Sequence, residues 1–96
     1  MSTCIKMDTV CRIGGEEFAV LLPGCGIEGS TDLAGRMRAA IEAMSGSYGL
    51  ITSSFGVSEV RGDTDSAKAL FSRADRALYA AKANGRNRVE RSNPET

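Results

Sequence analysis

Glu16 and Glu17 form an acidic pair that directly follows two adjacent glycines, Gly14 and Gly15. Two neighbouring carboxylates repel one another, and without a cation one of them tends to keep its proton. A divalent metal ion removes that repulsion, and glycine backbone beside it allows a ligand to approach closely. The run therefore indicates a metal-assisted phosphate site. The alternative that these residues leave open is an acidic turn exposed to solvent.

A second chemical cluster is cationic and lies toward the C-terminus. Lys82 falls near the end of a predicted helix, and Arg86 comes just after Gly85. A cation in the last turn of a helix is stabilising in itself, by about 0.3–1 kcal/mol, so Lys82 needs no function to explain it. Arg86 lies beyond the glycine and is less well explained in this way. A lysine point charge beside a planar guanidinium suits a polyphosphate, and with a carboxylate-held metal the pair predicts a nucleoside triphosphate site.

The elements that must position these groups begin with a hairpin. Short β-prone runs at 9–13 and 18–22 flank Gly14 and Gly15, and paired glycines between two such runs predict a tight turn. The run at 18–22 is almost wholly apolar, which is typical of a strand buried on both faces. Pro23 ends that strand and a loop follows.

A helix and a strand are expected next. An apolar stripe predicts a helix from the N-cap Ser30 to Gly46. Residues 51–60 then alternate as a strand, with Gly56 and hydroxyl side chains on one face. Small residues on that face leave room for a close neighbour, and the pattern does not distinguish a helix from a ligand.

A second helix and a closing strand complete the chain. Asp65 or Ser66 is the expected N-cap, Gly85 is the expected left-handed C-cap, and 87–90 reads as a short strand. The order is thus β-hairpin, helix, strand, helix, strand. This order predicts an α+β fold in which helices pack on a mostly antiparallel sheet.

Composition narrows the classes of partner. The 96 residues allow one domain with a modest core, and 12 Lys and Arg against 12 Asp and Glu leave no net charge. The charge balance gives no reason to expect a nucleic-acid polymer or an acidic membrane, and no apolar run is long enough for a membrane segment. The chain has no His, so its chemistry must rest on carboxylates, cations and backbone groups.

The three cysteines, Cys4, Cys11 and Cys25, are odd in number and form no CxxC pair. Such a set suggests neither a disulfide framework nor a zinc site. We therefore expect reduced thiols and a cytoplasmic location.

At this point the ordered motifs resemble the GGDEF domain, the diguanylate cyclase family, in a Glu-Glu form of its signature. The resemblance covers roughly residues 8 to 90, and no single motif carries it. Its motifs are the lead-in Asp8-Thr9-Val10-Cys11-Arg12-Ile13, the signature Gly14-Gly15-Glu16-Glu17-Phe18, Leu21-Leu22-Pro23, the strand Thr52-Ser53-Ser54-Phe55-Gly56-Val57, and the ending Ala74-Asp75-Arg76-Ala77-Leu78-Tyr79-Ala80-Ala81-Lys82-Ala83-Asn84-Gly85-Arg86-Asn87.

The resemblance implies a palm-like α+β domain, similar to polymerase palms and nucleotidyl cyclases. Two such domains meet as a homodimer, each holding one GTP with Mg²⁺ or Mn²⁺, and the product is cyclic di-GMP with release of pyrophosphate. Carried over, Glu16 would ligate the metal and help activate the 3′ hydroxyl, and Glu17 would support the metal and triphosphate. Gly14 and Gly15 would admit the nucleotide. The resemblance also implies that two cations bind the phosphates of the substrate, namely Lys82 and Arg86.

Two departures from the family pattern are visible. We expect the N-terminal part of the family's domain to be missing, with its second metal-binding Asp and its guanine-reading residues. The expected division is an irregular start at 1–7, a partial GGDEF domain at 8–91 and a tail at 92–96. The family's inhibitory site is an Arg-x-x-Asp, and here Asp8 is present while Ile5 replaces the Arg, so this site is degenerate.

Two hypotheses from different classes follow. The chain is either the catalytic half of a diguanylate cyclase, inactive by itself, or a non-catalytic GGDEF-like module that binds nucleotide or mediates dimerisation in bacterial signalling. The residues do not identify the input domain of the parent protein.

Overall fold

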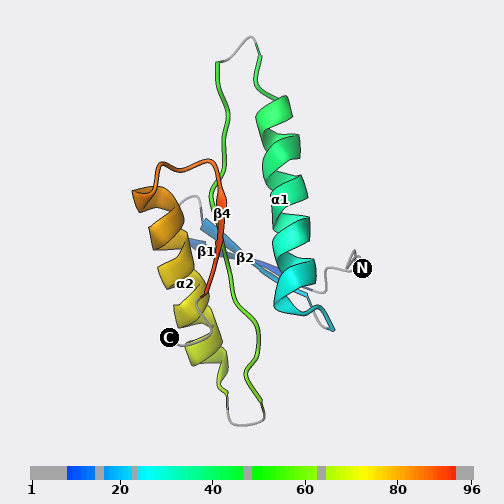
Figure 1. Ribbon diagram of the computed structural model, residues 1–96, viewed down its shortest axis with the longest axis vertical. Helices are drawn as coiled ribbons and strands as arrows, with labels where there is room; N and C mark the ends of the chain where they lie inside the picture. Colours follow the sequence, from blue (N-terminus) through cyan, green and yellow to red (C-terminus); the bar gives the residue numbers. More distant parts are fainter. Residues whose placement is uncertain (1–8, 15–16, 23, 47–48, 63–64, 93–96) are drawn as a thin grey trace.

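The computed structural model describes residues 9–14, 17–22, 24–46, 49–62 and 65–92, and for 9–14, 17–19 and 21 it describes the backbone alone. The elements come in the predicted order (Figure 1). They are β1 (Thr9–Gly14), β2 (Glu17–Leu21), α1 (Ile27–Ala43), β3 (Phe55–Val57), α2 (Ala67–Ala83) and β4 (Val89–Arg91). The α+β class predicted from the sequence is confirmed.

The strands form two separate pairs among the described residues. β1 and β2 are antiparallel, whereas β3 and β4 are parallel, with Phe55 opposite Val89. The parallel pair agrees with the connectivity, because neighbouring parallel strands need a crossover connection and α2 provides one between β3 and β4. Both helices contact β3 and β4, and Figure 1 shows β4 between α1 and α2. The helices therefore pack on a sheet as expected, while a single, mostly antiparallel sheet stays a prediction.

Gly56 is the point of closest approach between β3 and α2. A Cβ at this position would lie 2.1 Å from the carbonyl oxygen of Ala74 and 2.4 Å from the backbone nitrogen of Leu78. Two of the buried core residues, Ala77 and Ala81, lie on α2, and their small side chains permit this contact. The neighbour of the small-residue face of this strand is therefore a helix, which resolves the alternative that the sequence left open.

The two helices differ in the residue that accepts from the N–H groups of their first turn: it is a near neighbour for α2 and a distant residue for α1. Ser66 caps α2 as predicted, because its hydroxyl accepts a hydrogen bond from the Ala69 N–H at 3.0 Å. α1 begins at Ile27, earlier than the predicted Ser30 cap. There the Ile27 N–H donates to the Glu59 carboxylate at 2.8 Å, so a residue 32 positions away satisfies the first turn.

The strand predicted over 51–60 is shorter in the structure, where only Phe55–Val57 pairs. A strand needs a partner, and β4 offers only three residues. The extended residues on either side of β3 have no such partner within the described part of the chain.

The buried core is small. Among the described residues the buried apolar side chains are those of Ala34, Val57, Ala77 and Ala81, and no large side chain is fully buried. Large apolar side chains lie exposed instead, including Leu50 at 77% and Val60 at 64% exposure. Such exposure is unusual for an isolated domain and favours association.

We expect the isolated chain to self-associate. β4 pairs with Phe55 and Val57 through the Arg88 carbonyl and the Ser92 N–H, so the Gly56 backbone groups face the opposite edge of β3. Among the described residues this edge has no partner strand, and together with exposed Leu50 and Val60 on the chain before and after β3 it is a surface for a second copy. Light scattering at micromolar concentration should give at least twice the mass of 10.1 kDa. A monomer mass would contradict the expectation.

Cys25 corrects one expectation from the sequence. It is disulfide-bonded in the structure, so a reduced thiol was the wrong prediction for this residue. The side chains of Cys4 and Cys11 lie outside the described part.

Candidate functional site: an acidic hairpin and a cationic helix end

The predicted hairpin is confirmed at the level of the backbone, while the site assigned to it stays a prediction. Gly14 and Glu17 are opposite one another as the last pair of the β1–β2 ladder, with a register shift between Arg12 and Gly14. Such irregularities bend a strand and are frequent beside functional sites. Gly15 and Glu16 lie outside the described residues, as does the side chain of Glu17. Asp8 and Ile5, the remnants of the inhibitory motif, also lie outside them.

The helix-end half is built by the C-terminus of α2. Asn84 is the C-cap, and Gly85 follows with φ of +120°, a positive value that glycine adopts without strain. The Gly85 N–H donates to the Lys82 carbonyl and the Arg86 N–H to the Ala81 carbonyl, the hydrogen-bond pattern of a Schellman motif. The motif places Arg86 immediately past the helix, where its side chain is exposed.

The backbone after Gly85 is unusual. Arg86 and Asn87 both have positive φ, 64° and 49° respectively. Asparagine tolerates this region, whereas for arginine it costs on the order of 1–2 kcal/mol. Surrounding contacts must therefore hold Arg86 in this conformation.

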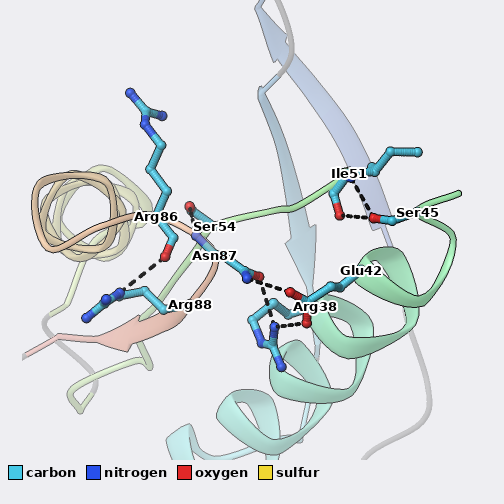
Figure 2. A network of polar contacts seen from close by, with 8 residues as sticks. All are labelled: Arg38, Glu42, Ser45, Ile51, Ser54, Arg86, Asn87 and Arg88. Carbon is cyan, nitrogen blue, oxygen red and sulfur yellow. Dashed lines mark hydrogen bonds and ion pairs between the residues drawn. The ribbon is translucent and has the colours of Figure 1, made fainter. Parts of the chain in front are cut away.

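Some of those contacts are made through the next residue, Asn87, whose side chain joins the loop after α2 to α1. Its Oδ1 accepts from Arg38 Nη1 at 2.9 Å, and its Nδ2 donates to Glu42 Oε2 at 2.8 Å. Arg38 also pairs with Glu42 at 3.1 Å, and the Asn87 N–H donates to Ser54 Oγ at 3.2 Å. Figure 2 shows Asn87 pointing toward α1, while the Arg86 side chain extends away from it.

The same contacts favour the ionised form of Glu42 on α1. The hydrogen bond from Asn87, followed by that from Arg38, lowers the pKa of Glu42 below its ordinary value. Glu42 is therefore held as a carboxylate, the form that accepts from both partners.

Lys82 lies in the last turn of α2, as predicted, and is partly buried. It lines a shallow hollow together with Asp75, Leu78 and Tyr79, one turn apart along a single face of the helix. Tyr79 is 75% exposed there. The hollow is open, so Lys82 borders a surface that a ligand can reach.

The two halves of the candidate site are not brought together within the described residues. β1 and β2 contact only one another among the described helices and strands, and neither contacts α2. The physical reason is that, in the part of the chain that the structure describes, no strand joins the β1–β2 pair to the β3–β4 pair. Neither do the described residues contain a cluster of three or more His, Cys, Asp or Glu that could hold a metal.

A separate charged pair holds the loop before α2. Asp65 and Arg73 form a two-pronged contact with nitrogen–oxygen distances of 3.1 and 2.5 Å, and their side chains are only 7% and 6% exposed. Arg73 also donates to the Glu59 carbonyl at 2.9 Å, and Asp65 accepts from the Arg61 N–H. This clamp holds Glu59 and Asp65 against α2.

Two groups of residues have structural roles that the sequence patterns did not predict. Asp65 was considered only as a cap, and Arg73 was assigned no role, although a buried arginine needs a carboxylate partner. Asn87 belonged to the quoted ending motif, yet it was assigned no role. The sequence feature that could have indicated a role for Asn87 is its place directly after Arg86, in the run that follows Gly85 at the end of the predicted helix.

Element order and site residues together define the class, an α+β domain consistent with the palm-like fold of nucleotidyl-transferring enzymes. The family profile described as "Diguanylate cyclase, GGDEF domain" matches residues 1–88. The chain belongs to the GGDEF domain family.

Three curated relatives support the assignment to this family. The chain is 44% identical over 86 residues to Diguanylate cyclase A of Treponema denticola, covering 85% of this chain and 23% of that protein. It is 45% identical over 89 residues to diguanylate cyclase DgcP of Pseudomonas aeruginosa, covering 88% and 13%. It is 38% identical over 89 residues to the response regulator PleD of Caulobacter vibrioides, covering 86% and 20%. The chain thus spans about a quarter or less of the length of each of these relatives.

The described part of the chain contains no helix long and apolar enough to cross a membrane.

Proposed function

We propose that this chain carries the acidic hairpin and the phosphate-binding helix end of a diguanylate cyclase domain. The reaction would condense two GTP into cyclic di-GMP with release of pyrophosphate. The observation that carries the proposal is the hairpin that pairs Gly14 with Glu17, in a chain of the GGDEF family. A hairpin that carries adjacent carboxylates presents oxygen ligands of the kind that Mg²⁺ and Mn²⁺ prefer.

Each site residue has a proposed role. Glu16 and Glu17 hold the divalent cation, which when bound neutralises phosphate charge and favours ionisation of the attacking hydroxyl. Gly14 and Gly15 admit the nucleotide close to the backbone. Lys82 and Arg86 bind phosphate oxygens, the lysine as a point charge and the arginine as a planar fork. The protein's contribution is positioning and charge neutralisation.

Turnover needs two such domains facing each other, and we propose that this chain alone binds nucleotide without completing the reaction. The resemblance implies that the family's second metal-binding Asp and its guanine-reading residues lie outside the motifs that this chain shares with the family. A cytoplasmic site of action is part of the same proposal.

The second candidate function is a non-catalytic module that binds nucleotide or mediates dimerisation. The absence of described contact between the hairpin strands and α2 favours it for the chain as it stands. Incubation with GTP and Mg²⁺ separates the two. No cyclic di-GMP from this chain, but product from a longer chain that also carries the upstream half of a GGDEF domain, supports the enzyme. No product from either supports the module.

GTP affinity tests the site residues directly. In titration calorimetry with GTP and Mg²⁺, Glu16→Gln and Lys82→Ala should each weaken binding by about ten- to a hundredfold, since each removes an interaction with a charge worth about 1.5–3 kcal/mol. Lys68→Ala is the matched control, because Lys68 is an exposed lysine at the opposite end of α2 and should leave the affinity unchanged. Unchanged affinity for GTP in both Glu16→Gln and Lys82→Ala would contradict the assignment of a phosphate site.

A further inference from the structure

We propose that Asn87 is the positioning residue for Arg86. Its side chain latches the loop after α2 onto α1 and thereby sets the backbone from which Arg86 reaches a phosphate. This inference rests on the proposed function, because it concerns how a phosphate-binding arginine is presented. The Asn87 latch is defined here as Asn87 with its partners Arg38, Glu42 and Ser54.

The chemistry of the latch calls for an asparagine. One end of the carboxamide accepts from the Arg38 guanidinium while the other donates to the Glu42 carboxylate, at 2.9 and 2.8 Å. An aspartate would meet Glu42 as a second negative charge, and an apolar side chain would leave both partners without this contact. The asparagine backbone also tolerates its φ of 49°.

The latch acts on Arg86 through the backbone. The Arg86 N–H is held by the Ala81 carbonyl, and the next N–H, that of Asn87, is held by Ser54. Between these two anchors Arg86 keeps a φ of 64°. Its exposed side chain points away from Asn87 and α1 (Figure 2), so the latch orients Arg86 without touching its guanidinium.

Loss of the latch should free the Arg86 backbone to leave its left-handed conformation. The guanidinium would then sample many directions, and phosphate affinity would fall even though Arg86 is still present. A purely structural role for Asn87 would lower stability alone. A positioning role lowers affinity in a way that depends on Arg86.

The test is a double-mutant cycle read by GTP–Mg²⁺ titration of the full chain. We expect Asn87→Asp and Arg86→Ala each to weaken binding about five- to tenfold. The double variant should be within twofold of Arg86→Ala, because Asn87 acts through Arg86. Asp32→Asn is the matched control: Asp32 pairs with Arg36 on the same helix at 3.1 Å, in an i,i+4 pair like that of Glu42, but is not part of the Asn87 latch.

A swapped pair gives the rescue. Asn87→Asp combined with Glu42→Gln reverses donor and acceptor, so that the glutamine amide donates to the new carboxylate while Arg38 keeps its contact. Affinity should return to within about twofold of the parent, and this variant supplies the test if Asn87→Asp alone does not fold. Losses that multiply in the Asn87–Arg86 double variant, or an unaltered affinity in Asn87→Asp, would overturn the inference while leaving the phosphate site standing. An unaltered affinity in Arg86→Ala would overturn Arg86 as a phosphate ligand and the inference with it.

Discussion

Gly56→Ala should unfold the domain or lower its free energy of unfolding by on the order of 3 kcal/mol or more. Overpacking a well-packed site costs about 1–3 kcal/mol when side chains can move, and occasionally more. Here the new methyl would meet backbone atoms of α2, at 2.1 Å from the Ala74 carbonyl oxygen. Backbone of a helix cannot give way without moving α2 off β3. Urea unfolding followed by circular dichroism measures the loss.

Gly35→Ala is the matched control for this variant. Gly35 lies within α1, where a new Cβ would meet nothing within 4 Å. Because glycine costs a helix interior about 0.5–1 kcal/mol relative to alanine, this substitution should stabilise the domain by that amount. Equal stability of Gly56→Ala and the parent chain would mean that α2 does not pack on β3 as described.

Acid should weaken the domain through the Asp65–Arg73 clamp. The Arg73 guanidinium holds the pKa of Asp65 well below its ordinary value of 3.8, with help from the Arg61 N–H. A carboxylate whose pKa is lowered by folding stabilises the fold above the unfolded-state pKa, and this contribution is lost as the pH falls through that value and below. Near neutral pH, Asp65 should therefore cause no change with pH in the urea concentration at the midpoint of unfolding. This midpoint should decline below about pH 4.

Asp65→Asn tests the clamp at neutral pH. It leaves the buried Arg73 without its counter-charge, so it should destabilise the domain clearly more than Asp32→Asn, which breaks an exposed pair on α1. The decline below pH 4 should also be shallower in Asp65→Asn than in the parent. Replacing both partners by apolar residues, as in Asp65→Leu with Arg73→Met, should recover much of the loss, because no unpaired charge then stays buried. An identical acid profile in the parent and Asp65→Asn would contradict this assignment.

Features with local causes were predictable from the sequence. The β1–β2 hairpin follows from paired glycines between β-prone runs, and the Ser66 cap from a hydroxyl three residues before the N–H that it accepts from. The C-terminal stop of α2 at Gly85 also depends on residues within one helical turn. Each depends on hydrogen bonds between near neighbours, so the residue types suffice to predict it.

Features that depend on packing were not predictable. The predicted start of α1 was wrong because the first N–H of the helix donates to Glu59, which is distant in sequence. The predicted strand at 51–60 was too long because the length of β4 limits it. The clamp and the Asn87 latch join residues that carry no sequence pattern of their own.

The acidic pair and the two cations were evident from the sequence by type and spacing, together with the element order that carries them and the family to which the chain belongs. Tertiary structure alone decided how the cationic end is held. A left-handed Arg86 is tolerated because Asn87 binds α1 across 49 positions to Arg38, and Gly56 is required because α2 meets β3 backbone to backbone. The reason is physical: residue type sets what a group can do, whereas distance and direction arise only when remote segments pack together.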